Sequence, residues 1–88
     1  MPFIFEEKGY RFAFYSGDLD EPIHVHVGKA GKQAKVWIQP IRVARKGGFK
    51  GHELNEIARI ADRRKAEIIA AWEREKDKRD DSEGDNHD

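Results

Sequence analysis

The segment Glu21-Pro22-Ile23-His24-Val25-His26-Val27 decides the fold of this 88-residue chain, because branched apolar and imidazole side chains alternate along it. A period of two is typical of a β-strand with one buried face. We therefore predict a strand whose apolar side chains face the core and whose imidazoles lie on the opposite face. Proline suits the first position of such a strand, since it has no N–H to donate.

The segments on either side predict further strands of a small, mostly antiparallel sheet. Residues 3–5, 10–15 and 33–39 favour extended structure, and short polar stretches with glycine separate them. Residues 41–44 suit a further short strand or an edge segment. We therefore expect three or four strands. By alternation, the core side holds Tyr10, Phe12, Phe14, Ala34, Val36 and Ile38, and the second side holds Arg11, Tyr15, Lys35 and Trp37.

From about residue 50 to residue 76 the apolar period changes from two to nearly 3.6, which is typical of an amphipathic helix. The apolar stripe consists of Leu54, Ile57, Ala58, Ala61, Ile68, Ile69 and Trp72. The pattern predicts one long C-terminal helix packed on the apolar face of the sheet. The expected fold class is therefore α+β.

The length indicates one small domain, which we place at residues 1–76. Residues 77–88 are mostly charged and contain no large apolar side chain. Such a segment cannot repay its ordering entropy by burial, so we expect a disordered acidic tail.

The composition excludes several classes of protein. The chain has no cysteine, which rules out disulfides and thiolate zinc sites. The first residues do not have the pattern of a signal peptide, and no apolar run approaches the roughly 20 residues that span a bilayer. We therefore expect a cytoplasmic protein that does not bind membranes.

The net charge of zero averages two unlike segments. Residues 73–88 hold eight acidic and four basic side chains, so the first 72 residues hold nine acidic and thirteen basic ones. Between residues 29 and 50 there are seven lysines or arginines and no acidic residue. This basic block indicates an anionic partner, or a solvated rim balanced by the acidic tail.

One helix can cover only one face of the sheet, and the apolar face is the one that needs covering. We therefore expect the second face, with both histidines, to be open. An uncovered tryptophan beside tyrosine and cations is typical of platforms that bind single-stranded nucleic acid, and of protein interfaces, including homodimers. The candidate binding residues are Arg11, Tyr15, Lys35, Trp37, Arg42, Arg45 and Lys46.

The pair His24 and His26 allows three hypotheses. The imidazoles could act as general acid and base in a metal-independent ribonuclease, with Arg11, Tyr15 and Lys35 in support. They could bind a metal, which requires a third ligand such as Asp18, Asp20, Glu21 or His52. They could also be polar side chains without a chemical role, on a strand that is exposed or covered by a partner. Because no carboxylate stands at a recognised ligand spacing, we expect no metal and no cofactor.

The motifs of this chain and their order resemble those of a small bacterial family known as domain of unknown function 4160. The resemblance covers about residues 1–73 and has its most specific feature in the Pro-x-His-x-His strand followed by a tryptophan. The matching segments are Arg11-Phe12-x-Phe14-Tyr15, Glu21-Pro22-x-His24-Val25-His26-Val27, Ala34-Lys35-Val36-Trp37-Ile38-x-Pro40, Val43-Ala44-Arg45-x-x-Gly48-Phe49, Glu53-Leu54 and Ala70-Ala71-Trp72. The departures are Ile23, where the family tends to have proline, and Lys50, where it tends to have a capping serine.

The resemblance implies a second small protein encoded nearby, in a toxin-antitoxin-like pair, and it implies no active site. We therefore expect a non-enzymatic binding component that contacts this protein partner, or RNA, through the open sheet face. The alternatives are the ribonuclease that uses His24 and His26, and a metal-binding module.

Overall fold

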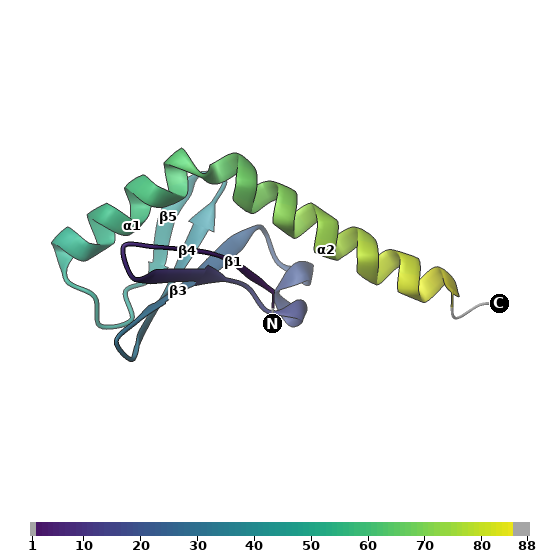
Figure 1. The fold of residues 1–88 in the computed structure, drawn as a ribbon, viewed down its shortest axis with the longest axis horizontal. Helices are drawn as coiled ribbons and strands as arrows, with labels where there is room; N and C mark the ends of the chain where they lie inside the picture. The colour runs from purple at the N-terminus through teal and green to yellow at the C-terminus, as the bar shows by residue number, and fades with distance from the viewer. Residues whose placement is uncertain (1, 86–88) are drawn as a thin grey trace.

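The computed structural model describes residues 2–85, with side chains to residue 79, and shows an antiparallel sheet with two helices above it (Figure 1). Its five strands lie side by side in chain order. They are β1 (Phe3–Glu7), β2 (Tyr10–Ala13), β3 (His24–Lys29), β4 (Lys32–Ile38) and β5 (Ile41–Arg45). A short 3₁₀ helix, η1 (Ser16–Asp20), precedes β3, and α1 (Gly51–Arg63) and α2 (Lys65–Asp85) follow β5. The predicted α+β class with an antiparallel sheet is confirmed.

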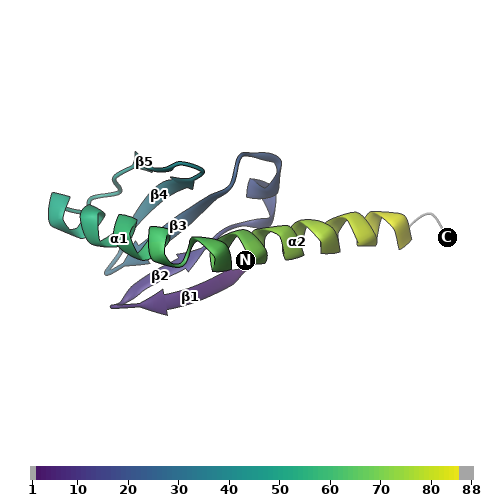
Figure 2. The ribbon, with the colours of Figure 1, turned by 90° about the horizontal axis from the view of Figure 1, so that it is seen from above.

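The strand register confirms the predicted faces. In the pairing of β3 with β4, His24 lies opposite Trp37 and His26 lies opposite Lys35. The apolar residues between them, such as Val25, belong to the main core, which α1 closes from above (Figure 2). The histidines are therefore on the face away from α1.

The expected number of three or four strands was wrong, because the sheet has five. Residues 41–45, where the sequence allowed a short strand or an edge segment, form a full edge strand. β5 pairs with β4 over its length, and Ile41 packs against the main core. This burial of an apolar side chain offsets the cost of ordering the segment.

The expectation of one long helix was also wrong, because the helix is interrupted at Arg64. The guanidinium of Arg64 lies 3.5 Å from the centroid of the Phe5 ring and forms ion pairs with Glu7 and Glu67. The interruption lets α1 follow the sheet while α2 runs out past its edge (Figure 2). None of the helices within residues 2–85 is both long and apolar enough to cross a bilayer.

The predicted boundary at residue 76 stays a prediction. The structure describes α2 as far as Asp85, and residues 86–88 of the expected tail lie outside the described residues.

A second, smaller apolar cluster lies at the end of the sheet where α2 leaves it. It consists of Phe14, Leu19, Ala71 and Trp72, and the rings of Phe14 and Trp72 have their centroids 5.1 Å apart. Leu19 belongs to η1, so this cluster fixes η1 against the body of the domain. Its packing determines where the polar residues of η1 lie.

Gly47 lies in the turn that follows β5, and this turn packs against the backbone of β4 at Gln33. The φ of Gly47 is +63°, and an added Cβ would lie 1.8 Å from the carbonyl oxygen of Gln33. Gly31 has φ +80° but open space around it. We expect Gly47→Ala to lower the free energy of unfolding by more than about 3 kcal/mol, and Gly31→Ala by only about 1 kcal/mol. Urea denaturation measures both values, and equal losses would contradict the assigned contact.

Candidate functional site

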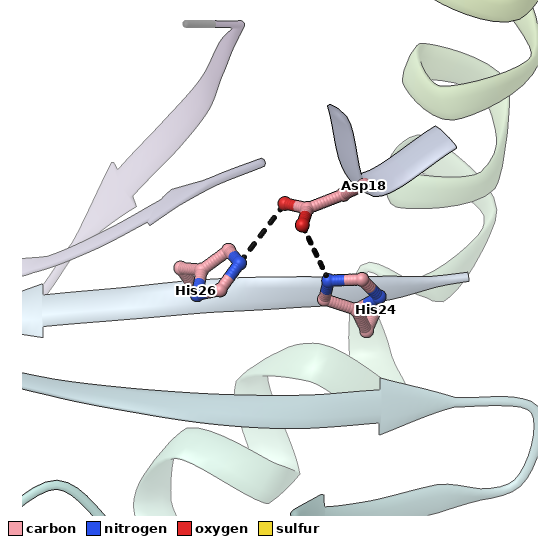
Figure 3. A group of neighbouring side chains, drawn as sticks. All are labelled: Asp18, His24 and His26. Atoms are coloured by element: carbon pink, nitrogen blue, oxygen red, sulfur yellow. Dashed lines mark hydrogen bonds and ion pairs between the residues drawn. The ribbon is translucent and has the colours of Figure 1, made fainter. Parts of the chain in front are cut away.

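The side chains of Asp18, His24 and His26 meet between η1 and β3 (Figure 3). Asp18 Oδ2 lies 2.9 Å from His26 Nε2, and Asp18 Oδ1 lies 3.2 Å from His24 Nε2. One carboxylate thus faces both imidazoles. We refer to these three residues as the Asp18 cluster.

Local structure explains how the Asp18 cluster forms. Alternation along β3 puts both imidazoles on one face, about 7 Å apart at their Cα atoms. The 3₁₀ turn brings Asp18 above them, and the backbone N–H of Tyr15 donates to Asp18 Oδ2 at 2.8 Å. Leu19, which is 3% exposed, anchors the same turn in the second apolar cluster.

The expectation that both imidazoles are uncovered was wrong. His24 is fully buried and His26 is 9% exposed, although neither lies under α1. The segment before β3 folds back over this end of the sheet, and Trp72 of α2 lies against the His24 ring, with the ring centroids 5.5 Å apart. Burial of Leu19 and Trp72 offsets the cost of ordering the segment, so it covers the histidines instead of remaining a solvated loop.

The hydrogen bonding of His24 fixes its tautomer. His24 Nδ1 lies 2.9 Å from the carbonyl oxygen of Pro22. Because a carbonyl oxygen only accepts, Nδ1 must carry the proton. In the neutral ring, Nε2 is then an unprotonated nitrogen, and it has no hydrogen-bond partner among the described residues.

The surroundings set the ionisation of the other two residues. Burial by itself would raise the pKa of Asp18, but the Tyr15 N–H and the two imidazoles outweigh it and hold that pKa below its ordinary value. Burial lowers the pKa of His26, against the opposing effect of Asp18. At neutral pH the cluster therefore contains an ionised carboxylate and a neutral His26.

The face of the sheet away from α1 has two shallow hollows. The first, of about 190 Å³, is lined by Phe3, Arg11, Ala13, Tyr15, His26, Gly28 and Gln33. The second, of about 250 Å³, is lined by Pro22, Trp37, Gln39, Pro40 and Arg42. Each hollow therefore combines an aromatic wall with an arginine.

The structure distributes the predicted binding residues over these hollows. Arg11 and Tyr15 line the first hollow, and Trp37 and Arg42 line the second. Lys35 lies on β4 between them, with its ammonium 4.6 Å from the centroid of the Trp37 ring and 3.0 Å from Glu21. Arg45 pairs in register with Lys35. Lys46 is exposed in the turn after β5 and lines neither hollow.

Sequence reasoning missed two contributors, Phe3 and Trp72, and did not select Asp18 from the candidates. Phe3 is 51% exposed at the first hollow, because an irregularity between Phe3 and Phe5 changes the side that Phe3 faces. Nothing in the apolar run at residues 3–5 indicates this. Trp72 was assigned to the helix stripe alone. Asp18 was one of four possible partners for the histidines, and only the fold of η1 selects it.

The molecule is thus a small α+β domain with a helix-covered face and a second face that carries two hollows and a buried His–Asp cluster. The family model described as Domain of unknown function (DUF4160) matches residues 9–73, so the chain belongs to this family. The comparisons with curated proteins and with solved structures found no match.

Asp18 is expected to stabilise this part of the fold. Asp18→Ala removes the acceptor for the Tyr15 N–H and for His26, and leaves the largely buried His26 ring without its partner. We expect it to lower the free energy of unfolding by about 2–4 kcal/mol. Asp20→Ala, which removes an exposed carboxylate paired with Arg79, should cost less than about 1 kcal/mol. Chemical denaturation followed by circular dichroism measures both, and a larger loss in Asp20→Ala would contradict the assignment.

Proposed function

We propose that this protein is a non-enzymatic binding module that holds single-stranded RNA on the sheet face away from α1. The observation that carries the proposal is the pair of hollows on one face, each with an aromatic wall and an arginine. Single-stranded RNA is bound by stacking of its bases on aromatic side chains and by cations that contact its phosphates. Both kinds of group are present side by side here.

Two exposed rings supply surfaces for stacking at the first hollow. Phe3 is 51% exposed and Tyr15 is 40% exposed, and they are the large hydrophobic side chains most open to solvent in the described residues. The guanidinium of Arg11 lies 5.0 Å from the centroid of the Phe3 ring. A base bound here would therefore meet an aromatic ring and a cation together.

Cations without acidic partners lie along the edge of the same face. Arg42, Arg45 and Lys46 form no ion pair within 4.0 Å among the side chains of residues 2–79, whereas Lys35 is paired with Glu21. Arg42 and Arg45 pair in register with Trp37 and Lys35 of β4, so they share their face. These arginines are available to phosphate groups without first breaking an ion pair.

The composition of this face favours RNA over a protein partner or a second copy of the chain. The cores of protein interfaces are depleted of charged residues. Here Arg11, Lys35, Arg42 and Arg45 lie across the face, between and beside the aromatic side chains. Binding to a neighbouring gene product in a toxin-antitoxin-like pair, which the family resemblance implies, and homodimerisation remain predictions.

The geometry also favours binding over cleavage. General acid–base catalysis on RNA needs both imidazoles within reach of the phosphodiester. His24 is fully buried, and only His26 lines a hollow. The ribonuclease hypothesis therefore lacks one accessible group, and incubation of labelled RNA with the protein checks it directly.

Fluorescence anisotropy with a labelled single-stranded RNA tests the proposal. Arg42→Ala should weaken binding and reduce the slope of log K against log salt by about 0.7, as expected for one lost phosphate contact. Arg59→Ala removes the same charge from the exposed surface of α1 and should leave the slope unchanged. Tyr15→Leu should weaken binding about 5- to 100-fold with no change in slope, because stacking does not release counterions.

The proposal fails if the protein does not bind the RNA at 50 mM salt, or if Arg59→Ala weakens binding as much as Arg42→Ala. A different outcome would point to a protein partner instead. In that case the protein would not bind RNA, and both the unaltered protein and Arg42→Ala would pull down the neighbouring gene product.

A further inference from the structure

We propose that Asp18, His24 and His26 form a zinc site, in which His24 Nε2, His26 Nε2 and the Asp18 carboxylate bind a single Zn²⁺. The inference does not depend on RNA binding, because it rests on the buried cluster and not on the open face. It differs from the sequence-based expectation of no metal, because only the fold of η1 brings the carboxylate to the two histidines.

His24 is oriented as metal-binding histidines usually are. Its Nδ1–H donates to the Pro22 carbonyl oxygen at 2.9 Å, so its Nε2 lone pair points toward the carboxylate of Asp18. Histidines that bind a metal are almost always held in this way: the N–H of the other ring nitrogen donates a hydrogen bond to a carbonyl, a carboxylate or a water. The backbone before β3 therefore fixes both the tautomer and the direction of the ring.

The contact between His24 and Asp18 needs a positive charge. His24 Nε2 is fully buried, has no hydrogen-bond partner among the described residues and lies 3.2 Å from Asp18 Oδ1. Two acceptors in contact in a buried site are unfavourable. Either a proton or a metal ion between them would turn this contact into an attraction, and the third ligand, His26, favours the metal.

The remaining ligands lie close enough to His24 to complete a coordination set. One ligand atom from each residue lies within 4.8 Å of the others. Asp18 Oδ2 lies 2.9 Å from His26 Nε2 and Asp18 Oδ1 lies 3.2 Å from His24 Nε2, and adjacent ligand atoms around tetrahedral zinc are about 3.3 Å apart. His26 becomes a ligand when its proton moves to Nδ1, which has no hydrogen-bond partner among the described residues.

The donor set selects the class of ion. Two imidazoles and one carboxylate suit zinc and its neighbours among the transition metals, whereas Ca²⁺ and Mg²⁺ prefer six or more oxygen ligands. Three protein ligands leave one position for water. Because the ligands come from η1 and β3, the ion would hold the 3₁₀ segment on the sheet.

Both tryptophans of the chain report on this site. The ring centroid of His24 lies 5.3 Å from that of Trp37 and 5.5 Å from that of Trp72. A paramagnetic ion bound at the cluster should therefore quench the fluorescence of both side chains. This gives a readout that a surface-bound ion would not produce.

The test uses the full chain after treatment with a chelator. Isothermal titration with Zn²⁺ gives the stoichiometry and affinity, Co²⁺ gives visible absorption and tryptophan quenching, and thermal unfolding gives the stabilisation. The variants are Asp18→Asn and His26→Gln. The matched control is His52→Gln combined with His87→Gln, which removes the two histidines outside the cluster.

We expect the unaltered protein and the control to bind one Zn²⁺ per chain and to gain about 10 °C or more in melting temperature at a hundredfold excess over Kd. Asp18→Asn and His26→Gln should bind at least tenfold more weakly and lose the Co²⁺ quenching. His26→Gln decides the result if circular dichroism shows that Asp18→Asn is unfolded. The proposal is overturned if the unaltered protein does not bind Zn²⁺ at micromolar concentration and pH 7.5, or if only the control loses binding.

Discussion

The packing of η1 against the end of the sheet is the constraint on which the candidate site depends. Leu19 enters a small apolar cluster with Phe14 and Trp72, and this burial holds the 3₁₀ turn over β3. Without that contact Asp18 would be a solvated loop residue, and the two histidines would lie on an open surface. A few apolar side chains thus determine the polarity, burial and hydrogen bonding of the site.

The two faces of the sheet differ in what they contribute: one holds the apolar core, and the other presents polar and aromatic side chains. The face toward α1 is a continuous apolar core that includes Phe12, Val25 and Val36. The opposite face is covered only where η1 and Trp72 lie over His24, and elsewhere it presents arginines and aromatic rings beside the two hollows. Stability is therefore concentrated on one side, which leaves the second side available for a ligand.

Much of this arrangement follows from local patterns. Alternation of side chains identified β3, placed Val25 and Val36 in the core, and put Arg11 with Trp37 on the second face. These predictions succeed because a one-residue change of register would move every apolar side chain of a strand into water. Helix periodicity likewise identified the helical segment after β5, but it predicted one helix and could not show the interruption at Arg64, whose side chain contacts the distant Phe5 and Glu7.

The sequence alone therefore determined the antiparallel sheet, the helical C-terminal half and the two faces of β2, β3 and β4, because these follow from side-chain period within one segment. The tertiary structure decided which segment covers which part of that face. The burial of His24, the choice of Asp18 as its partner and the pairing of Arg42 with Trp37 in one hollow all join residues from different segments. Such contacts form because the packing of whole elements removes apolar surface from water. The pattern of side chains within one segment does not show how much surface that packing buries.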